Sequence, residues 1–216
     1  MIKNIRMDVY DETPSKTKKP IAELESKLAD EKKEDTTFNE IDYGLNIDES
    51  VIYLHGDIML GSLFDFIAKV RIILKNRPFE NAEDPINLLI NSNGGDVYEA
   101  LGIIDYIESL AVPVNIIARG RAMSAAAMIL CCGTGRRVAS KQTTIMLHEA
   151  SAEIMGKTAD IKANADHIDG LENDFYSVMA RKTSQPEDFW RKACRKDFYI
   201  SAAYAKEIGV IDEVLL

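Results

Sequence analysis

Short hydrophobic runs alternate with segments of helical periodicity along most of the chain. Apolar runs of strand length, bounded by polar or glycine-containing turns, occur at Val51–Leu54, Ile86–Ile90, Val112–Ala118 and Thr144–Leu147, with a strand edge at Val138. Segments with helical spacing lie between and after them, at Leu60–Leu74, Asp96–Leu110, Ser124–Cys132, Ala159–Arg181 and Ser201–Ile208. Strands that alternate with helices are typical of parallel βαβ units, so the pattern predicts an α/β domain.

The beginning of the chain lacks this alternation. Residues 1–42 carry 8 basic and 11 acidic side chains, and only Pro20–Leu28 has the spacing of a short amphipathic helix. So charged a segment buries little apolar surface and is predicted to be a solvated, partly disordered arm. We therefore divide the chain into an N-terminal arm, residues 1–45, and a folded domain, residues 46–216.

The composition of the chain limits which partners it can bind and in which cellular compartment we expect it. The 216 residues have a net charge of −9, which argues against nucleic acid and anionic membranes as partners. The longest apolar run, Ala122–Cys132, is too short to cross a bilayer. Met1–Tyr10 lacks the apolar core of a signal peptide. Cys131, Cys132 and Cys194 fit neither a disulfide framework nor a zinc site, so we expect no metal. Cys131 and Cys132 lie in an apolar run and are expected to be buried, reduced thiols, which suggests a cytoplasmic location.

Two turns that follow predicted strands could carry chemistry. Gly94 and Gly95 follow Ile86–Ile90, where they form either a simple turn or a loop whose N–H groups face an anion. Ser124 opens a helix of small residues, where it is either an N-cap or a nucleophile that another chain can approach closely. In the second case the N–H of Ala125, at the helix start, would stabilise an oxyanion.

A histidine and an aspartate complete the set. His148 ends the strand Thr144–Leu147, whereas we expect His55 to be structural or to line a substrate site and His167 to be solvated. Asp197 follows two cations, and such an aspartate usually forms a surface salt bridge. Ser124, His148 and Asp197 together provide a nucleophile, a base and a carboxylate, but their spacing alone does not bring them together in space.

In order and spacing, these stretches resemble the ClpP peptidase family. Ile90–Gly95 is similar to the family's I-N-S-P-G-G turn, with Asn93 in place of proline. Gly120–Ser124 is similar to the G-x-A-x-S nucleophile motif, and Met146–His148 to the base motif. Asp197–Asp212 resembles the end of the family's sequence, whose first aspartate belongs to the triad. The similarity extends over residues 48–216.

The resemblance implies an architecture and partners. The fold would be the ClpP/crotonase-like α/β fold of repeated ββα units, with a protruding handle that consists of a strand, Glu149–Thr158, and the long helix Ala159–Arg181. A peptide substrate would pair edge-on with the handle strand. Subunits would form homo-oligomeric heptameric rings, single or double, and the arm would lie where the family gates the pore and contacts an AAA+ unfoldase.

The resemblance also implies a serine endopeptidase that acts through an acyl-enzyme without a cofactor. Ser124 would be the nucleophile, His148 the general base and Asp197 the residue that orients it, and the N–H groups of Gly95 and Ala125 would form the oxyanion hole. Substrate-binding residues would lie around them, at Gly94, Val97, Met123, Glu149, Ala150 and Ser151.

Departures from the family pattern leave alternatives open. Arg195 and Lys196 replace an acidic–basic pair that joins two rings, so a single ring or an altered contact remains open. Ala152 and Glu153 replace glycines and alter substrate pairing. Gly95–Val97 resembles phage-encoded members that process capsid or scaffold proteins, in which case the location would be the host cytoplasm. A crotonase acting on acyl-CoA is less favoured because it needs no Ser-His-Asp set, and a Ser/Lys dyad with Lys141 is less favoured because His148 fits the base motif.

Overall fold

A twisted, mainly parallel sheet forms the centre of the molecule. The computed structural model describes residues 40–151 and 155–215; the predicted helix Pro20–Leu28 and most of the predicted arm lie outside this range. The main path of the sheet runs through β1 (Leu45–Asn46), β2 (Val51–Ile58), β3 (Ile86–Gly95), β4 (Val114–Met123), β5 (Arg137–Ser140) and β8 (Glu213–Leu215). All neighbours on this path are parallel except β1 and β2. The α/β prediction is therefore confirmed.

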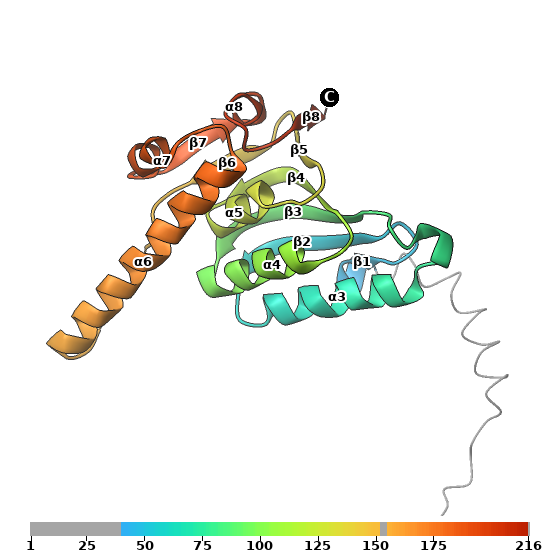
Figure 1. The fold of residues 1–216 in the computed structure, drawn as a ribbon, viewed down its shortest axis with the longest axis horizontal. Helices are drawn as coiled ribbons and strands as arrows, with labels where there is room; N and C mark the ends of the chain where they lie inside the picture. The colour runs from blue at the N-terminus through green and yellow to red at the C-terminus, as the bar shows by residue number, and fades with distance from the viewer. Residues whose placement is uncertain (1–39, 152–154, 216) are drawn as a thin grey trace, which may run out of the picture.

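Helices cover one face of the sheet. They are α3 (Ser62–Asn76), α4 (Val97–Ser109) and α5 (Ala125–Cys131), which pack against one another in that order (Figure 1). Burial alternates along β3, where Ile86, Leu88 and Ile90 are at most 1% exposed. These side chains join Ile103 and Ile107 of α4 in one continuous core. The period of two along β3 thus matches the buried face that the hydrophobic pattern predicts.

A change of pairing partner along β4 brings a second group of strands beside the sheet. Residues 116–118 of β4 pair with β5, whereas residues 121–123 pair with β6 (Thr144–Leu147). On its other side β6 pairs antiparallel with β7 (Phe198–Ser201), which leads into α8 (Ala202–Glu207). The ends of β4 and β6 and the start of β7 therefore lie at one edge of the sheet.

The long helix α6 (Thr158–Lys182) projects from the body of the molecule (Figure 1). Its 25 residues are mostly exposed, and only Tyr176 and Met179, near its C-terminal end, are buried. α6 is followed by α7 (Glu187–Ala193), a short helix that the hydrophobic pattern did not predict. None of the helices within the described ranges is long and apolar enough to cross a membrane.

The predicted handle strand, Glu149–Thr158, is not a strand in its described part. Residues 149–151 and 155–157 have no strand assignment, and Thr158 already belongs to α6. A strand is defined by backbone pairing with a neighbouring strand, and no described segment of the chain pairs with these residues in a ladder. For residues 149–151 and 155–158 the prediction of a strand is therefore wrong, and residues 152–154 lie outside the described part of the chain.

Candidate active site

Ser124 lies at the junction of β4 and α5 in an unusual backbone conformation. Its φ is 52° and its ψ is −124°, a region that residues other than glycine rarely adopt. Its N–H donates to the carbonyl of Met146 at 2.7 Å, which joins it to β6. Ser124 does occupy the N-cap position of α5, as predicted, but its side chain makes no capping hydrogen bond to the helix. The Ser124 hydroxyl instead lies 2.8 Å from Nε2 of His148.

Strand register brings His148 to Asp197. Leu147 of β6 pairs with Phe198 of β7, so the next residue pair beyond the antiparallel ladder is His148 and Asp197. Oδ1 of Asp197 lies 3.4 Å from Nδ1 of His148, and the Tyr199 hydroxyl donates to Oδ2 of Asp197 at 3.5 Å. The aspartate contacts the histidine rather than a neighbouring cation, although 54% of its side chain is exposed.

The paired glycines allow the end of β3 to pass beside the serine. A Cβ atom on Gly94 would lie 2.5 Å from the Met123 carbonyl oxygen and 2.9 Å from Cβ of Ser124. A Cβ atom on Gly95 would lie 2.1 Å from the Ile58 carbonyl oxygen. Both glycines also have positive φ values, 94° and 142°, which favour glycine. Glycine is therefore required at both positions for two reasons: a Cβ atom would clash with neighbouring backbone, and the turn needs positive φ values.

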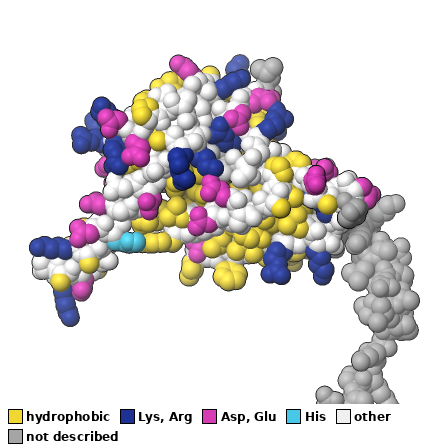
Figure 2. Space-filling model, in the orientation of Figure 1, with side chains coloured by type: hydrophobic (Ala, Val, Ile, Leu, Met, Phe, Trp, Pro, Cys, Tyr) yellow, Lys and Arg dark blue, Asp and Glu magenta, His cyan; other side chains and the backbone are white. Residues whose placement is uncertain are grey.

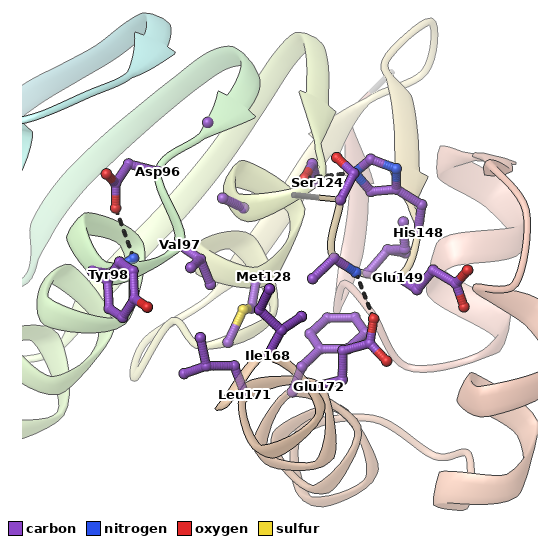
Figure 3. Close-up of a pocket in the computed structure, with 16 residues that line it drawn as sticks. Asp96, Val97, Tyr98, Ser124, Met128, His148, Glu149, Ile168, Leu171 and Glu172 are labelled. Atoms are coloured by element: carbon purple, nitrogen blue, oxygen red, sulfur yellow. Dashed lines mark hydrogen bonds between the residues drawn. The ribbon is translucent and has the colours of Figure 1, made fainter. Parts of the chain in front are cut away.

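A cavity of about 360 Å³ opens beside Ser124 (Figure 3). Gly95 and Ala125 line it, as do four of the six predicted substrate-binding residues, namely Val97, Glu149, Ala150 and Ser151. Gly94 and Met123 do not line it; Gly94 packs closely against the Met123 backbone instead. A role of Gly94 and Met123 in substrate binding therefore stays a prediction.

The rest of the lining was missed by the sequence reasoning. It includes Tyr98, Met128, Leu147 and one face of α6, made by Ile168, Leu171, Glu172 and Phe175. The spacing of the α6 residues is i, i+3, i+4 and i+7, which places them on one side of a helix. This helical spacing was the only sign in the sequence that these four residues share one face of α6. The spacing alone does not show that this face lines the cavity beside Ser124.

Glu172 introduces a carboxylate into this lining. Its Oε1 accepts a hydrogen bond from the backbone N–H of Ala150 at 3.0 Å (Figure 3). Burial raises the pKa of Glu172, and the charges of Glu149 and Asp169 raise it further, while the Ala150 N–H and Arg191 lower it. The helix α6 is thereby joined to the backbone just beyond His148.

Two other histidines lie apart from Ser124. His167 on α6 is exposed but not merely solvated, because its Nε2 lies 2.9 Å from the Tyr98 hydroxyl and the two rings stack at 6.0 Å. That pair joins α6 to the start of α4. His55 on β2 is exposed and is not part of the cavity lining, so the structure does not place it against a substrate there.

All three cysteines are buried free thiols, which confirms the prediction for Cys131 and Cys132. Burial raises the pKa of Cys131, and it raises the pKa values of Cys132 and Cys194 to about 12. Such thiols are protonated at neutral pH and are poor nucleophiles. In the described part of the chain no three His, Cys, Asp or Glu side chains are grouped so that they could hold a metal ion.

Comparison with known proteins identifies the family. A family model described as Clp protease matches residues 39–216. The ATP-dependent Clp protease proteolytic subunit 2 of Parasynechococcus marenigrum is 37% identical over 141 residues, which cover 63% of this chain and 72% of the relative. The proteolytic subunits 1 of a Synechococcus species and of Prochlorococcus marinus are 36% and 35% identical over similar lengths. The chain therefore belongs to the Clp protease family and is a serine endopeptidase of the ClpP type.

Proposed function

We propose that Ser124, His148 and Asp197 are the catalytic residues with which this protein hydrolyses peptide bonds in unfolded polypeptides. The observation that carries the proposal is the 2.8 Å contact between the Ser124 hydroxyl and Nε2 of His148. A serine hydroxyl is a weak nucleophile until an adjacent base accepts its proton. The strained backbone of Ser124 supports the same role, because such conformations are concentrated at functional sites.

In the first half of the reaction the Ser124 oxygen attacks the substrate carbonyl carbon while its proton passes to Nε2 of His148. Asp197 accepts from Nδ1–H, which keeps Nε2 free to accept and stabilises the imidazolium that forms. His148 then gives the proton to the leaving nitrogen, the C–N bond breaks and an acyl-enzyme remains. Water then gives a proton to His148 as its oxygen attacks the acyl carbon; the ester bond breaks, and His148 returns the proton to the Ser124 oxygen.

Backbone N–H groups of Gly95 and Ala125 are proposed to stabilise the tetrahedral oxyanion. Both residues line the cavity beside Ser124. Ala125 is the first residue of α5, so its N–H has no acceptor within the helix. A preorganised donor of this kind contributes roughly 10²–10³ in kcat in other hydrolases. Val97, Glu149, Ala150 and Ser151, which line the same cavity, are proposed to contact the substrate.

We propose that the active form is a homo-oligomeric ring, with a heptamer as the expected size. Large apolar side chains are exposed where β2 leads into α3, including Leu60 at 89%, Phe64 at 79% and Met59 at 60%. Figure 2 shows hydrophobic side chains gathered over α3 and α4. Contiguous apolar surface of this kind favours burial against another subunit. An AAA+ unfoldase that docks near the charged arm is the proposed source of unfolded substrate.

Two experiments test the catalytic assignment. Ser124→Ala is expected to lower kcat for a fluorogenic peptide by on the order of 10⁶, because the three residues act as a unit. A fluorophosphonate probe is expected to label Ser124 in the assembled wild-type protein. Full hydrolysis by purified Ser124→Ala protein would contradict the assignment. The proposed ring is tested separately by light scattering, because a monomer, one ring and two rings differ in size.

A further inference from the structure

The cavity beside Ser124 combines an apolar floor with acidic side chains. Its apolar lining includes Val97, Met128, Ile168, Leu171 and Phe175. Three of the lining residues are acidic, namely Asp96, Glu149 and Glu172, and none of the described residues that line it is lysine or arginine. A substrate side chain that enters the cavity therefore meets both apolar surface and negative charge.

The three carboxylates are not equivalent. Oδ1 of Asp96 accepts from the N–H groups of Tyr98 and Glu99 at the start of α4, where the helix dipole offsets the negative charge. Glu149 is exposed, so water screens it. Glu172 is partly buried on the same face of α6 as the apolar side chains of the floor. Its charge is thus the one most available to a substrate.

Glu172 has unused capacity to accept hydrogen bonds. One oxygen accepts from Ala150 N–H at 3.0 Å, and the other has no hydrogen-bond partner among the described residues. None of the ion pairs within 4.0 Å in the described part of the chain involves Glu172. Arg191, the basic residue that lowers its pKa, is paired with Glu187 and lies over the Tyr176 ring.

We propose that Glu172 is a specificity-determining residue: it makes the enzyme favour substrates whose P1 residue, the one that contributes the attacked carbonyl, has a long apolar stem and a cationic tip, as lysine and arginine do. This inference rests on the proposed function of Ser124. The methylene stem packs on the apolar floor, and the tip reaches the carboxylate of Glu172. An acidic P1 side chain is repelled by the same charge.

A purely apolar P1 residue fits the cavity less well in one respect. It would cover the Glu172 carboxylate without giving it a donor, and an ionised group that loses water without a partner is costly. A cationic tip removes that cost because it supplies both charge and hydrogen-bond donors. The carboxylate therefore discriminates between side chains of similar length and shape.

The test compares two peptides that differ only at P1, one with lysine and the other with norleucine, which has the same number of side-chain carbon atoms but no ammonium group. The ratio of their kcat/KM values is measured in the wild-type protein and in Glu172→Gln. Glutamine keeps an acceptor for the Ala150 N–H but removes the charge. We expect the lysine-to-norleucine ratio to fall about five- to tenfold in Glu172→Gln, since charge-assisted hydrogen bonds are roughly twice as strong as neutral ones.

The matched control is Asp174→Asn, which removes one charge from the exposed side of the same helix, outside the cavity. It is expected to leave the ratio unchanged. A ratio that does not change in Glu172→Gln, or that falls equally in Asp174→Asn, overturns the role of Glu172. A third peptide with glutamate at P1 is expected to gain in Glu172→Gln, and failure to gain counts against the proposal.

Binding separates this inference from the proposed catalytic role. The same peptides, labelled with a fluorophore, are titrated against Ser124→Ala protein with and without Glu172→Gln, and the ratio of their Kd values is measured by anisotropy. A charge-dependent preference in binding supports the role of Glu172 even if the wild-type protein hydrolyses neither peptide, which would contradict the catalytic proposal alone. Hydrolysis of the norleucine peptide with no charge-dependent preference in rate or binding overturns the inference alone.

Discussion

The Asp197 carboxylate lies 3.4 Å from Nδ1 of His148, on the side of the ring opposite to the contact with Ser124. The Ser124 contact, at 2.8 Å, is the shorter of the two. Hydrogen bonds of catalytic groups are often long in the absence of substrate and shorten when it binds. Of the three proposed catalytic residues, the half-exposed Asp197 is therefore the one that we expect to move closer to His148 when substrate binds.

Asp197→Asn is expected to lower kcat by on the order of 10⁴, a smaller fall than the one expected for Ser124→Ala. Asparagine can donate to Nδ1 of His148 and stabilise the tautomer that no longer accepts the serine proton at Nε2. The measurement is kcat for a fluorogenic peptide in the assembled protein, with its size checked by light scattering. Wild-type turnover in Asp197→Asn would show that the carboxylate is not needed to orient His148.

The residues of the site could be selected from the sequence, but their geometry could not. Each side chain had an ordinary explanation in isolation: an N-cap for Ser124 and a surface salt bridge for Asp197. The structure brings both side chains to His148 because β6 pairs with β4 and with β7 at the same edge. These pairings join segments far apart in the chain. Hydrophobic periodicity records which face of a strand is buried, but not which strand lies beside it.

Gly94→Ala is expected to abolish peptide hydrolysis and to lower the free energy of unfolding by about 1–3 kcal/mol. The new Cβ atom would lie 2.5 Å from the Met123 carbonyl oxygen and 2.9 Å from the Ala125 nitrogen, so the turn must shift beside Ser124. The φ of 94° adds backbone strain. Chemical denaturation and peptide hydrolysis provide the measurements.

The control for this change is Gly170→Ala in α6. A Cβ atom there would meet no atom within 4 Å, so alanine is expected to stabilise the helix by about 0.5–1 kcal/mol and leave hydrolysis unchanged. Equal effects of the two substitutions would show that close approach does not decide the role of Gly94.

Arg137 and Asp212 join β5 to the segment before β8. The Asp212 carboxylate accepts from the backbone N–H of Arg137 at 2.8 Å and from its guanidinium group. Hydrogen bonds from the Arg137 side chain are the main cause that lowers the pKa of Asp212. A lowered pKa in the folded state means that the ionised group stabilises the fold at pH values above the ordinary aspartate pKa of about 3.9. This stabilisation is lost as pH falls through the lowered value.

Asp212→Asn is therefore expected to be less stable than the wild-type protein from about pH 5 to pH 7, and the difference is expected to shrink as pH falls below about 4. Urea denaturation at several pH values measures it, with Asp174→Asn as the control for net charge. A difference that stays constant down to pH 3 would mean that the carboxylate charge does not contribute.

The fold was predictable where the hydrophobic pattern is long and regular. The predicted helices Leu60–Leu74 and Ala159–Arg181 agree with α3 and α6 within two residues at each end. By contrast, β7 has only four residues, and its start resembled a turn into α8. α7 has seven residues, too few for a clear helical period. Both elements are held by tertiary contacts, among them the packing of Trp190 in the core.

The backbone strain of Ser124 can be measured apart from its chemistry. Ser124→Ala and Ser124→Gly both remove the hydroxyl, so their difference in stability reports the backbone. Glycine adopts a φ of 52° with a ψ of −124° at little cost, whereas alanine retains the strain. We expect Ser124→Gly to be more stable than Ser124→Ala by about 1 kcal/mol, measured by urea denaturation, although glycine loses more entropy on folding.

The opposite order is expected at Ala127, two residues into α5, where the backbone is helical and the side chain is buried. There Ala127→Gly is expected to destabilise the protein by about 1 kcal/mol or more, from helix propensity and lost packing. If Ser124→Gly is also the less stable member of its pair, the serine backbone is not strained. In that case the backbone conformation of Ser124 costs no measurable stability, and the surrounding structure does not have to compensate for strain in order to hold Ser124 against His148.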